Sequence, residues 1–197
     1  MKRKILVIAP KSKEMMLLRA ALRRESALRD LNYRYVCVHA GQGKVNAAIA
    51  ATKALEKNPY DLVAVVGYAS GASGLSRGEV VSPRLAYYHD VRMPKKFVYD
   101  LQIGRALAGG DDSILLTGDW FFDGNAARWY EGVFGNRTVF DMEGNAVAQV
   151  AERYSVQVMA VRMISYRPVL DVIDDHMEFV QGENDFSPIL RVLENWE

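Results

Sequence analysis

Cysteine, long apolar stretches and secretion signals are almost absent from this sequence. A single cysteine, Cys37, occurs among 197 residues, so no disulfide can form within the chain. It lies in the apolar run at residues 35–38, which indicates a small buried hydrophobic residue rather than a nucleophile. No window is long and apolar enough to span a bilayer, and the apolar run at residues 5–9 is too short for a secretory signal. We therefore expect a cytoplasmic protein that does not associate with membranes.

An excess of charge of one sign is missing as well. The 25 basic and 24 acidic side chains leave a net charge of +1, which gives no overall attraction to nucleic acid or to anionic lipid. The locally basic segment at residues 19–29 is interrupted by Glu25 and predicts a solvated helix face. Half of the residues are apolar, which is enough for a substantial core, and the length predicts a single domain over residues 1–197.

Short apolar runs alternate with helix-like patterns along nearly the whole chain. This alternation predicts an α/β fold, a single domain with a twisted central mixed sheet and helices on both faces. Several of the runs have no polar alternation, which is typical of strands buried on both faces. The strands are expected at residues 5–9, 33–38, 61–67, 79–87, 113–117, 138–140 and 156–164, and residues 95–108 are expected to form one of the helices.

Residues suited to chemistry follow these strands directly, and in open α/β sheets ligands bind at such strand ends. The most prominent stretch is residues 137–150, where a short strand runs into Asp141, Met142 and Glu143 and then into a helix. Acidic residues also suit a helix start because of its dipole and its free N–H groups, and on this motif alone that structural explanation is favoured. The residues that follow strands are Glu14, Gly41, Gly67, Phe121, Glu143 and Ser165.

Two glycine-rich turns and an aromatic cluster complete the candidate features. Gly41 and Gly43 would let backbone N–H groups approach a partner, but the third glycine of a dinucleotide site is missing and no Ser or Thr follows Lys44, which excludes a P-loop. The small residues at 67–74 predict a pocket wall. The three aromatic residues at 120–122 either fill the core or stack on a flat ring. For His89, a hydrogen-bonded structural role is favoured over a catalytic one.

In their order and spacing these motifs resemble the nucleoside phosphorylase and nucleosidase superfamily, and most of all its bacterial 5′-methylthioadenosine/S-adenosylhomocysteine nucleosidases. The resemblance extends over residues 5–165 and implies that superfamily's fold, cleavage of a nucleoside N-glycosidic bond without metal or organic cofactor, and a homodimer. The similar pieces are GQGKVNAA at 41–48, VGYASG at 66–71, YHD at 88–90, TGD at 117–119, FDME at 140–143 and RMIS at 162–165.

The resemblance also implies roles for single residues. Glu143 would bind the ribose hydroxyls, Met142 would pack on the sugar and Phe121 would lie on the base. Glu14 would orient and deprotonate the attacking water, and Ser165 would belong to the turn that presents an acid to the base. These residue types suit the reaction, because a carboxylate stabilises an oxocarbenium-like sugar and a second one activates water. The remaining residues expected to bind substrate are Gly67, Tyr68, Phe122 and Asp141, and Tyr68 would narrow the pocket because it replaces a small residue.

One departure from the family pattern concerns the acid. Purine-specific members carry an aspartate after the Arg-Ala-Ile-Ser motif, and here the position is Tyr166, whose phenol has a pKa near ~10 and is a poor acid at neutral pH. Three alternatives stay open. Asp171 takes over as the acid, or the substrate carries a base that needs no such proton, or the protein binds nucleosides and cleaves them poorly or not at all.

The nucleophile is the second open point. The phosphorylase pattern of Gly-Asp-Pro with a nearby arginine is absent after the first strand, which favours water and hence hydrolysis of an adenosine-type thionucleoside. Lys11, Lys13 and Arg92 leave a phosphate site and a phosphorylase as the alternative, because lysine binds phosphate as a point charge. The predicted catalytic residues are therefore Glu14, Tyr166 and Asp171. A domain whose strand-end residues are purely structural is the last alternative.

Overall fold

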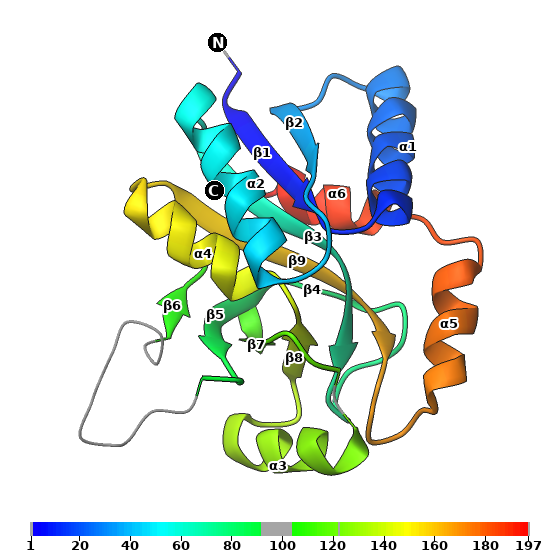
Figure 1. The fold of residues 1–197 in the computed structure, drawn as a ribbon. Helices are drawn as coiled ribbons and strands as arrows, with labels where there is room; N and C mark the ends of the chain where they lie inside the picture. The colour runs from blue at the N-terminus through cyan, green and yellow to red at the C-terminus, as the bar shows by residue number, and fades with distance from the viewer. Residues whose placement is uncertain (1, 92–103, 122, 197) are drawn as a thin grey trace.

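Figure 1 shows the fold in the computed structural model, which describes residues 2–91, 104–121 and 123–196. Within these ranges no helix is long and apolar enough to cross a membrane. The strands are β1 (Lys4–Ala9), β2 (Arg34–His39), β3 (Leu62–Gly71), β4 (Val80–Val81), β5 (Pro83–Tyr88), β6 (Arg105–Ala106), β7 (Asp111–Thr117), β8 (Thr138–Asp141) and β9 (Gln157–Tyr166). The helices are α1 (Ser12–Leu28), α2 (Lys44–Lys57), α3 (Gly124–Phe134), α4 (Gly144–Arg153), α5 (Ile173–Gln181) and α6 (Ser187–Glu194).

All of these strands belong to one mixed sheet, and its arrangement leaves a gap beside β3. The order is β2-β1-β3-β8-β7-β5-β6, while β9 pairs with β3 along its other edge and also with β4. On the first edge, β1 runs parallel to residues 62–65 of β3, and β8 runs antiparallel to residues 70–71. In the described part of the chain, residues 66–69 of β3 thus have no strand partner on this edge. The C-terminal ends of β1 and β8 approach each other from opposite sides of this gap.

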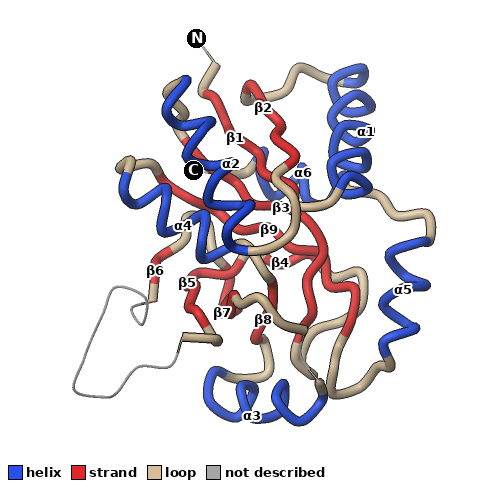
Figure 2. The backbone as a smooth tube through the Cα atoms, in the orientation of Figure 1, coloured by secondary structure: helices blue, strands red, loops and turns tan. Residues whose placement is uncertain are grey.

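Helices cover both faces of the sheet, as Figure 2 shows. Successive side chains of a strand point to opposite faces, so one strand can supply two cores. Leu6 and Ile8 of β1 pack with α2 and α4, whereas Ile5 and Val7 pack with α1 and α6. All four side chains are completely buried. This confirms the predicted α/β fold with a mixed sheet and helices on both faces, and it confirms that the first strand is buried on both sides.

A predicted strand end and a predicted helix are wrong, each because tertiary pairing overrides the local pattern. Strand β3 continues to Gly71 instead of ending at residue 67, since β9 pairs with its residues 62–70 and β8 pairs with its last two residues. A helix was expected at residues 95–108. The described part of that segment, residues 104–108, contains strand β6, which pairs antiparallel with β5. The rest of the segment lies outside the described residues.

The core between the sheet and α6 provides a test of stability. Phe186 is completely buried there, and its ring centroid lies 5.3 Å from that of Tyr68. We expect Phe186→Ala to lower the free energy of unfolding by about 3–5 kcal/mol, because it removes buried apolar area and leaves a cavity. The exposed Leu28→Ala serves as the control and should stay within about 0.5 kcal/mol of the parent chain in a urea titration. Equal effects of the two substitutions would contradict this description of the core.

Candidate active site

A pocket opens at the gap between the ends of β1 and β8. The empty space in and in front of it, open solvent included, amounts to about 550 Å³. Glu14 and Glu143 both line it, so the two acidic residues that the sequence singled out do share one cavity. Among the described residues, its lining consists of Pro10, Lys11, Glu14, Gln42, Tyr68, Ala69, Ser70, Trp120, Phe121, Phe140, Asp141, Met142, Glu143, Ser165 and His176.

Glu14 occupies the place that a strand partner of β3 would take. Its Oε1 accepts the backbone N–H of Tyr68 at 2.8 Å, and Tyr68 lies within the unpaired stretch of β3. Its Oε2 accepts the N–H of Lys11, also at 2.8 Å, at the start of α1. A side chain at Gly67 would place a Cβ only 2.6 Å from Oε1, so this position must be glycine. The carboxyl group is almost completely buried, and burial raises the pKa of Glu14 above its usual value.

Glu143 is the N-cap residue that precedes α4, but its side chain makes no capping hydrogen bond to that helix. Its Oε1 accepts the backbone N–H of Gly43 at 2.9 Å, and Gly43 has φ +94°, a conformation that favours glycine. Its Oε2 lies 3.6 Å from Nη2 of Arg162. Burial raises the pKa of Glu143 to about 7, with the negative charge of Asp141 adding to the effect and Arg162 opposing it. The helix-start explanation is therefore wrong for Glu143.

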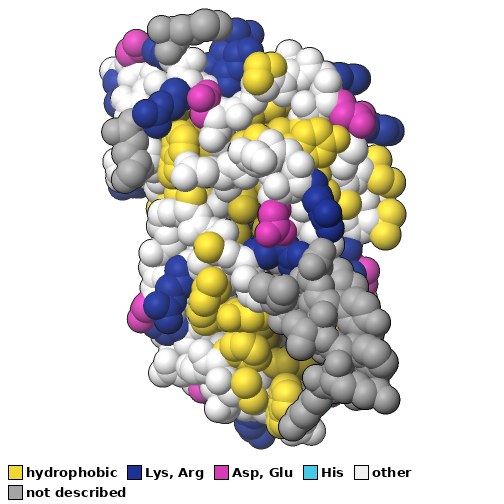
Figure 3. Space-filling model, turned by 90° about the vertical axis from the view of Figure 1, so that its left-hand side faces the viewer, with side chains coloured by type: hydrophobic (Ala, Val, Ile, Leu, Met, Phe, Trp, Pro, Cys, Tyr) yellow, Lys and Arg dark blue, Asp and Glu magenta, His cyan; other side chains and the backbone are white. Residues whose placement is uncertain are grey.

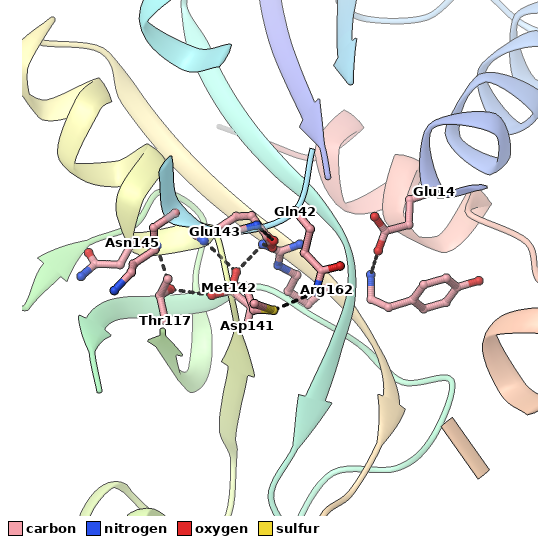
Figure 4. Close-up of polar contacts among 12 residues, drawn as sticks. Glu14, Gln42, Thr117, Asp141, Met142, Glu143, Asn145 and Arg162 are labelled. Carbon is pink, nitrogen blue, oxygen red and sulfur yellow. Dashed lines mark hydrogen bonds and ion pairs between the residues drawn. The ribbon is translucent and has the colours of Figure 1, made fainter. Parts of the chain in front are cut away.

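Asp141, by contrast, satisfies the free groups at the start of α4. Its Oδ2 accepts the N–H of Gly144 at 2.8 Å, and its Oδ1 accepts the hydroxyl of Thr117, whose oxygen accepts the N–H of Asn145 at 2.9 Å. Arg162 also donates to Oδ2. Figure 4 shows this network beside the end of β8, with Glu14 to its right in this view. Asp141 borders the pocket, but both of its oxygens are already engaged.

Arg162 is a site residue that the sequence analysis did not single out. It projects from the middle of β9, is completely buried, and contacts Asp141 and Glu143. Within the described part of the chain its Nε and Nη1 have no hydrogen-bond partner. The signal in the sequence was an arginine inside the apolar run at residues 156–164, which a buried strand accommodates only if the charge is paired. Arg162 interacts electrostatically with three carboxylates, those of Asp141, Glu143 and Glu14, and Lys11 is a second cation at the pocket, so the site is electronegative when all three carboxylates are ionised.

Aromatic rings form the other end of the pocket. Phe121 is 48 % exposed and stacks on Tyr166, with ring centroids 5.5 Å apart. The side chain of Met142 lies nearer the acidic residues and its Sδ accepts a hydrogen bond from Gln42 at 2.9 Å. Ser165 and His176 complete this end, with Ser165 Oγ 3.0 Å from His176 Nδ1. His176 was passed over in the sequence, because nothing in the pattern of α5 distinguishes it from an ordinary helix residue.

Comparison with known proteins identifies the family. A curated 5′-methylthioadenosine/S-adenosylhomocysteine nucleosidase from Haemophilus influenzae is 30 % identical over 66 % of this chain and 67 % of its own. The chain belongs to this nucleosidase family. A relative with the same name from Shewanella pealeana is 26 % identical and covers 81 % of this chain and 80 % of its own. No protein-family model matches the chain.

Solved nucleosidase structures have the same fold. The enzyme from Colwellia psychrerythraea, in complex with adenine, aligns with a TM-score of 0.80 at 20 % identity and covers 98 % of this chain and 95 % of its own. The enzyme from Neisseria meningitidis, in complex with methylthio-immucillin-A, gives 0.79 at 20 % identity and covers 98 % and 99 %. At this identity the likeness concerns the fold alone.

The predicted site residues divide into those that line the pocket and those that do not. Glu14, Tyr68, Phe121, Asp141, Met142, Glu143 and Ser165 line the pocket, and Gly67 lies against Glu14 without lining it. The ring of Tyr68 packs against Phe179 and Phe186 in the core, and whether this residue narrows the cavity stays a prediction. His89 packs against Trp120 and Tyr130 and does not line the pocket, which agrees with a structural role. Phe122 and Arg92 lie outside the described residues.

The two expected acids, Tyr166 and Asp171, are not among the residues that line the pocket. Tyr166 lies beneath Phe121 with 6 % of its surface exposed, and burial raises the pKa of its phenol further. The carboxylate of Asp171 accepts hydrogen bonds from the backbone N–H and the guanidinium of Arg167, which hold its pKa below the usual value despite partial burial. An ionised carboxylate paired in this way is unsuited to act as an acid, so the structure does not support Asp171 as the substitute.

The buried charge cluster predicts a large loss of stability when Asp141 is neutralised. Asp141→Asn should lower the free energy of unfolding by about 3–5 kcal/mol, because it leaves Arg162 buried with only the more distant Glu143 as its partner. The control is Asp112→Asn, which removes an exposed ion pair with Arg137 and should cost about 0–1 kcal/mol. Chemical denaturation of both variants measures the difference. A cost for Asp141→Asn as small as that of the control would refute the pairing.

The raised pKa of Glu143 predicts the pH at which its charge harms stability. Between the usual glutamate pKa of about 4.5 and the folded value of about 7, the folded state holds a proton that the unfolded chain has released, so stability falls as pH rises. Glu143→Gln removes this charge and should be more stable than the parent chain above pH 7, by up to about 3 kcal/mol. The advantage should shrink toward zero near pH 4.5. Denaturant titrations between pH 5 and 8 test this, and a difference that does not change with pH would contradict it.

Proposed function

We propose that the protein hydrolyses the N-glycosidic bond of an adenosine-type thionucleoside and releases the free base and the sugar. The observation that carries the proposal is the pocket with Glu14 at one side and Glu143 at the other, in a chain of the nucleosidase family. The named activity of the relatives, and the adenine and nucleoside-analogue complexes of the structural neighbours, support this substrate class.

Glu143 is the proposed ligand of the ribose hydroxyls. Its Oε1 is oriented by Gly43, and its Oε2, 3.6 Å from Arg162, retains capacity to accept a hydrogen bond from a substrate hydroxyl. Cleavage gives the sugar oxocarbenium character, and a carboxylate fixed beside the sugar stabilises the developing positive charge. In this arrangement Met142 packs on the sugar, while Asp141 acts through Arg162 and does not touch the substrate.

Glu14 is the proposed general base. The two backbone N–H groups fix its orientation, while burial raises its pKa and makes the carboxylate a stronger base. The water oxygen forms the new bond to the anomeric carbon, and one of its protons passes to Glu14. The electrons of the broken C–N bond leave with the base, which must also gain a proton.

Phe121 and Ser165 are proposed to contact the base. Phe121 rests on Tyr166 and is half exposed at the pocket, which suits it to stack on a flat heterocycle. Tyr166 then supports this platform instead of serving as the acid. Gly67 contributes by making room for Glu14, and Tyr68 contributes its backbone N–H and its packing in the core.

A homodimer and a cytoplasmic location belong to the same proposal. Apolar side chains exposed on α2 and at the end of α4 support an association of two copies, among them Val45, Ile49 and Tyr154. Figure 3 looks onto the left-hand side of Figure 1, where α4 lies, and shows hydrophobic patches among charged side chains. The single cysteine suits the reducing cytoplasm.

The decisive experiment follows release of adenine from methylthioadenosine by chromatography. We expect Glu14→Gln to lower kcat by a factor of about 10²–10⁴, because it removes the base but keeps the backbone hydrogen bonds possible. The exposed Glu56→Gln is the control and should leave the rate unchanged.

Inorganic phosphate should not accelerate adenine release if water is the nucleophile. Acceleration by phosphate would identify a phosphorylase instead. Binding of methylthioadenosine in calorimetry without any release of adenine by the parent chain would identify a nucleoside-binding protein that does not cleave its ligand.

A further inference from the structure

The proposed reaction needs a proton donor for the leaving base, and the residue best placed to supply it is His176 on α5. This side chain lines the pocket at the aromatic end, where it is 9 % exposed. Its ring lies edge-on to Phe121 and Tyr166, with centroids 5.7 Å and 6.1 Å away. It therefore lies beside the surface on which the base is proposed to stack.

The hydrogen bonds around His176 leave one ring nitrogen for a ligand. Nδ1 lies 3.0 Å from Ser165 Oγ, and that hydroxyl lies 3.2 Å from the carbonyl oxygen of Ala69. Ser165 has one hydroxyl proton, so both contacts are hydrogen bonds at once only if Nδ1–H donates to Ser165 and Ser165 donates to Ala69. In the described part of the chain Nε2 has no hydrogen-bond partner. A proton on Nε2 would complete the imidazolium form without disturbing either contact.

We propose that His176 is the acid that protonates the leaving base, with Ser165 and the Ala69 carbonyl holding its ring in place. This inference rests on the proposed function. It also accounts for the departure at Tyr166, because the chain then carries its acid on the following helix instead of directly after Ser165.

The step balances as follows. The C–N bond breaks, its electron pair passes to the base, and a ring nitrogen of the base takes the proton from Nε2. Water adds to the anomeric carbon and loses a proton to Glu14, and exchange with solvent later returns His176 and Glu14 to their starting forms. Burial, together with the positive charge of Lys11 from the loop after β1, lowers the pKa of His176. The protonated side chain is accordingly a stronger acid than protonated free histidine. A smaller fraction of His176 is protonated at neutral pH.

The first test compares two leaving groups. His176→Phe keeps a flat ring against Phe121 but has no nitrogen, and His176→Gln keeps polar atoms but has no transferable proton. Both should lower kcat for methylthioadenosine by a factor of about 10²–10⁴. With p-nitrophenyl riboside, whose leaving group departs without protonation, both should stay within about threefold of the parent chain. The exposed Glu178→Gln on the same helix is the control and should match the parent on both substrates.

The second test measures binding without turnover, in the Glu14→Gln background. Adenosine is compared with analogues in which the ring nitrogen at position 1, 3 or 7 is replaced by CH. One of these replacements should weaken binding by about tenfold or more, because it removes the acceptor of a charge-assisted hydrogen bond. That penalty should vanish when His176→Phe is added. This binding cycle decides the matter even if the parent chain does not accept the nitrophenyl substrate.

The outcomes separate the inference from the proposed function. If the His176 variants lose activity equally on both leaving groups, or lose none, or if every analogue keeps its penalty in His176→Phe, then His176 is not the acid. The proposed hydrolysis would survive all three results. If the parent chain releases no adenine, the proposed hydrolysis itself fails, whether or not nucleosides bind, and the inference falls with it.

Discussion

The charge of the pocket depends on the guanidinium of Arg162. It is completely buried, contacts Asp141, and lies 3.6 Å from Glu143. A buried cation is tolerated only with close partners, so Asp141 and Arg162 fix each other and the strands that carry them. The other two carboxylates, those of Glu14 and Glu143, accept backbone N–H groups and feel Arg162 from farther away, and burial raises their pKa values.

Sheet topology explains why these side chains meet. β1 and β8 approach along one edge of β3 from opposite directions and stop before they touch. The backbone groups of β3 in the gap need partners, and the N–H of Tyr68 finds one in Glu14. The pocket thus lies where the strand pairing of β3 is interrupted, and the Glu14 side chain accepts a backbone hydrogen bond that a strand would otherwise accept. It resembles the crevice at a topological switch point, although here the strand ends face the middle of β3 instead of a common edge of the sheet.

Much of this arrangement could be predicted from the sequence, and the failures have physical causes. The apolar run at residues 5–9 and the alternation of strands with helices were sufficient for the fold class, because burial on both faces leaves a clear pattern. Glu14 and Glu143 could be identified because each comes shortly after a strand and because the order of the motifs resembles that of the nucleosidases. The partnership of Glu143 with Gly43 could not, because it joins residues far apart in the chain. Tyr166 and Asp171 were misjudged for a similar reason: their surroundings, Phe121 and Arg167, are known only in three dimensions.

Tyr68 joins the pocket to the core on the far side of β3. Its backbone N–H holds Glu14, while its ring packs against Phe186 at the start of α6 and Phe179 on α5. Helix α6 contributes no side chain to the cavity, yet the core at its start holds Tyr68, whose backbone N–H fixes the carboxylate of Glu14. Repacking of this core would therefore reach the pocket through the backbone of β3, without any change in the residues that line the cavity.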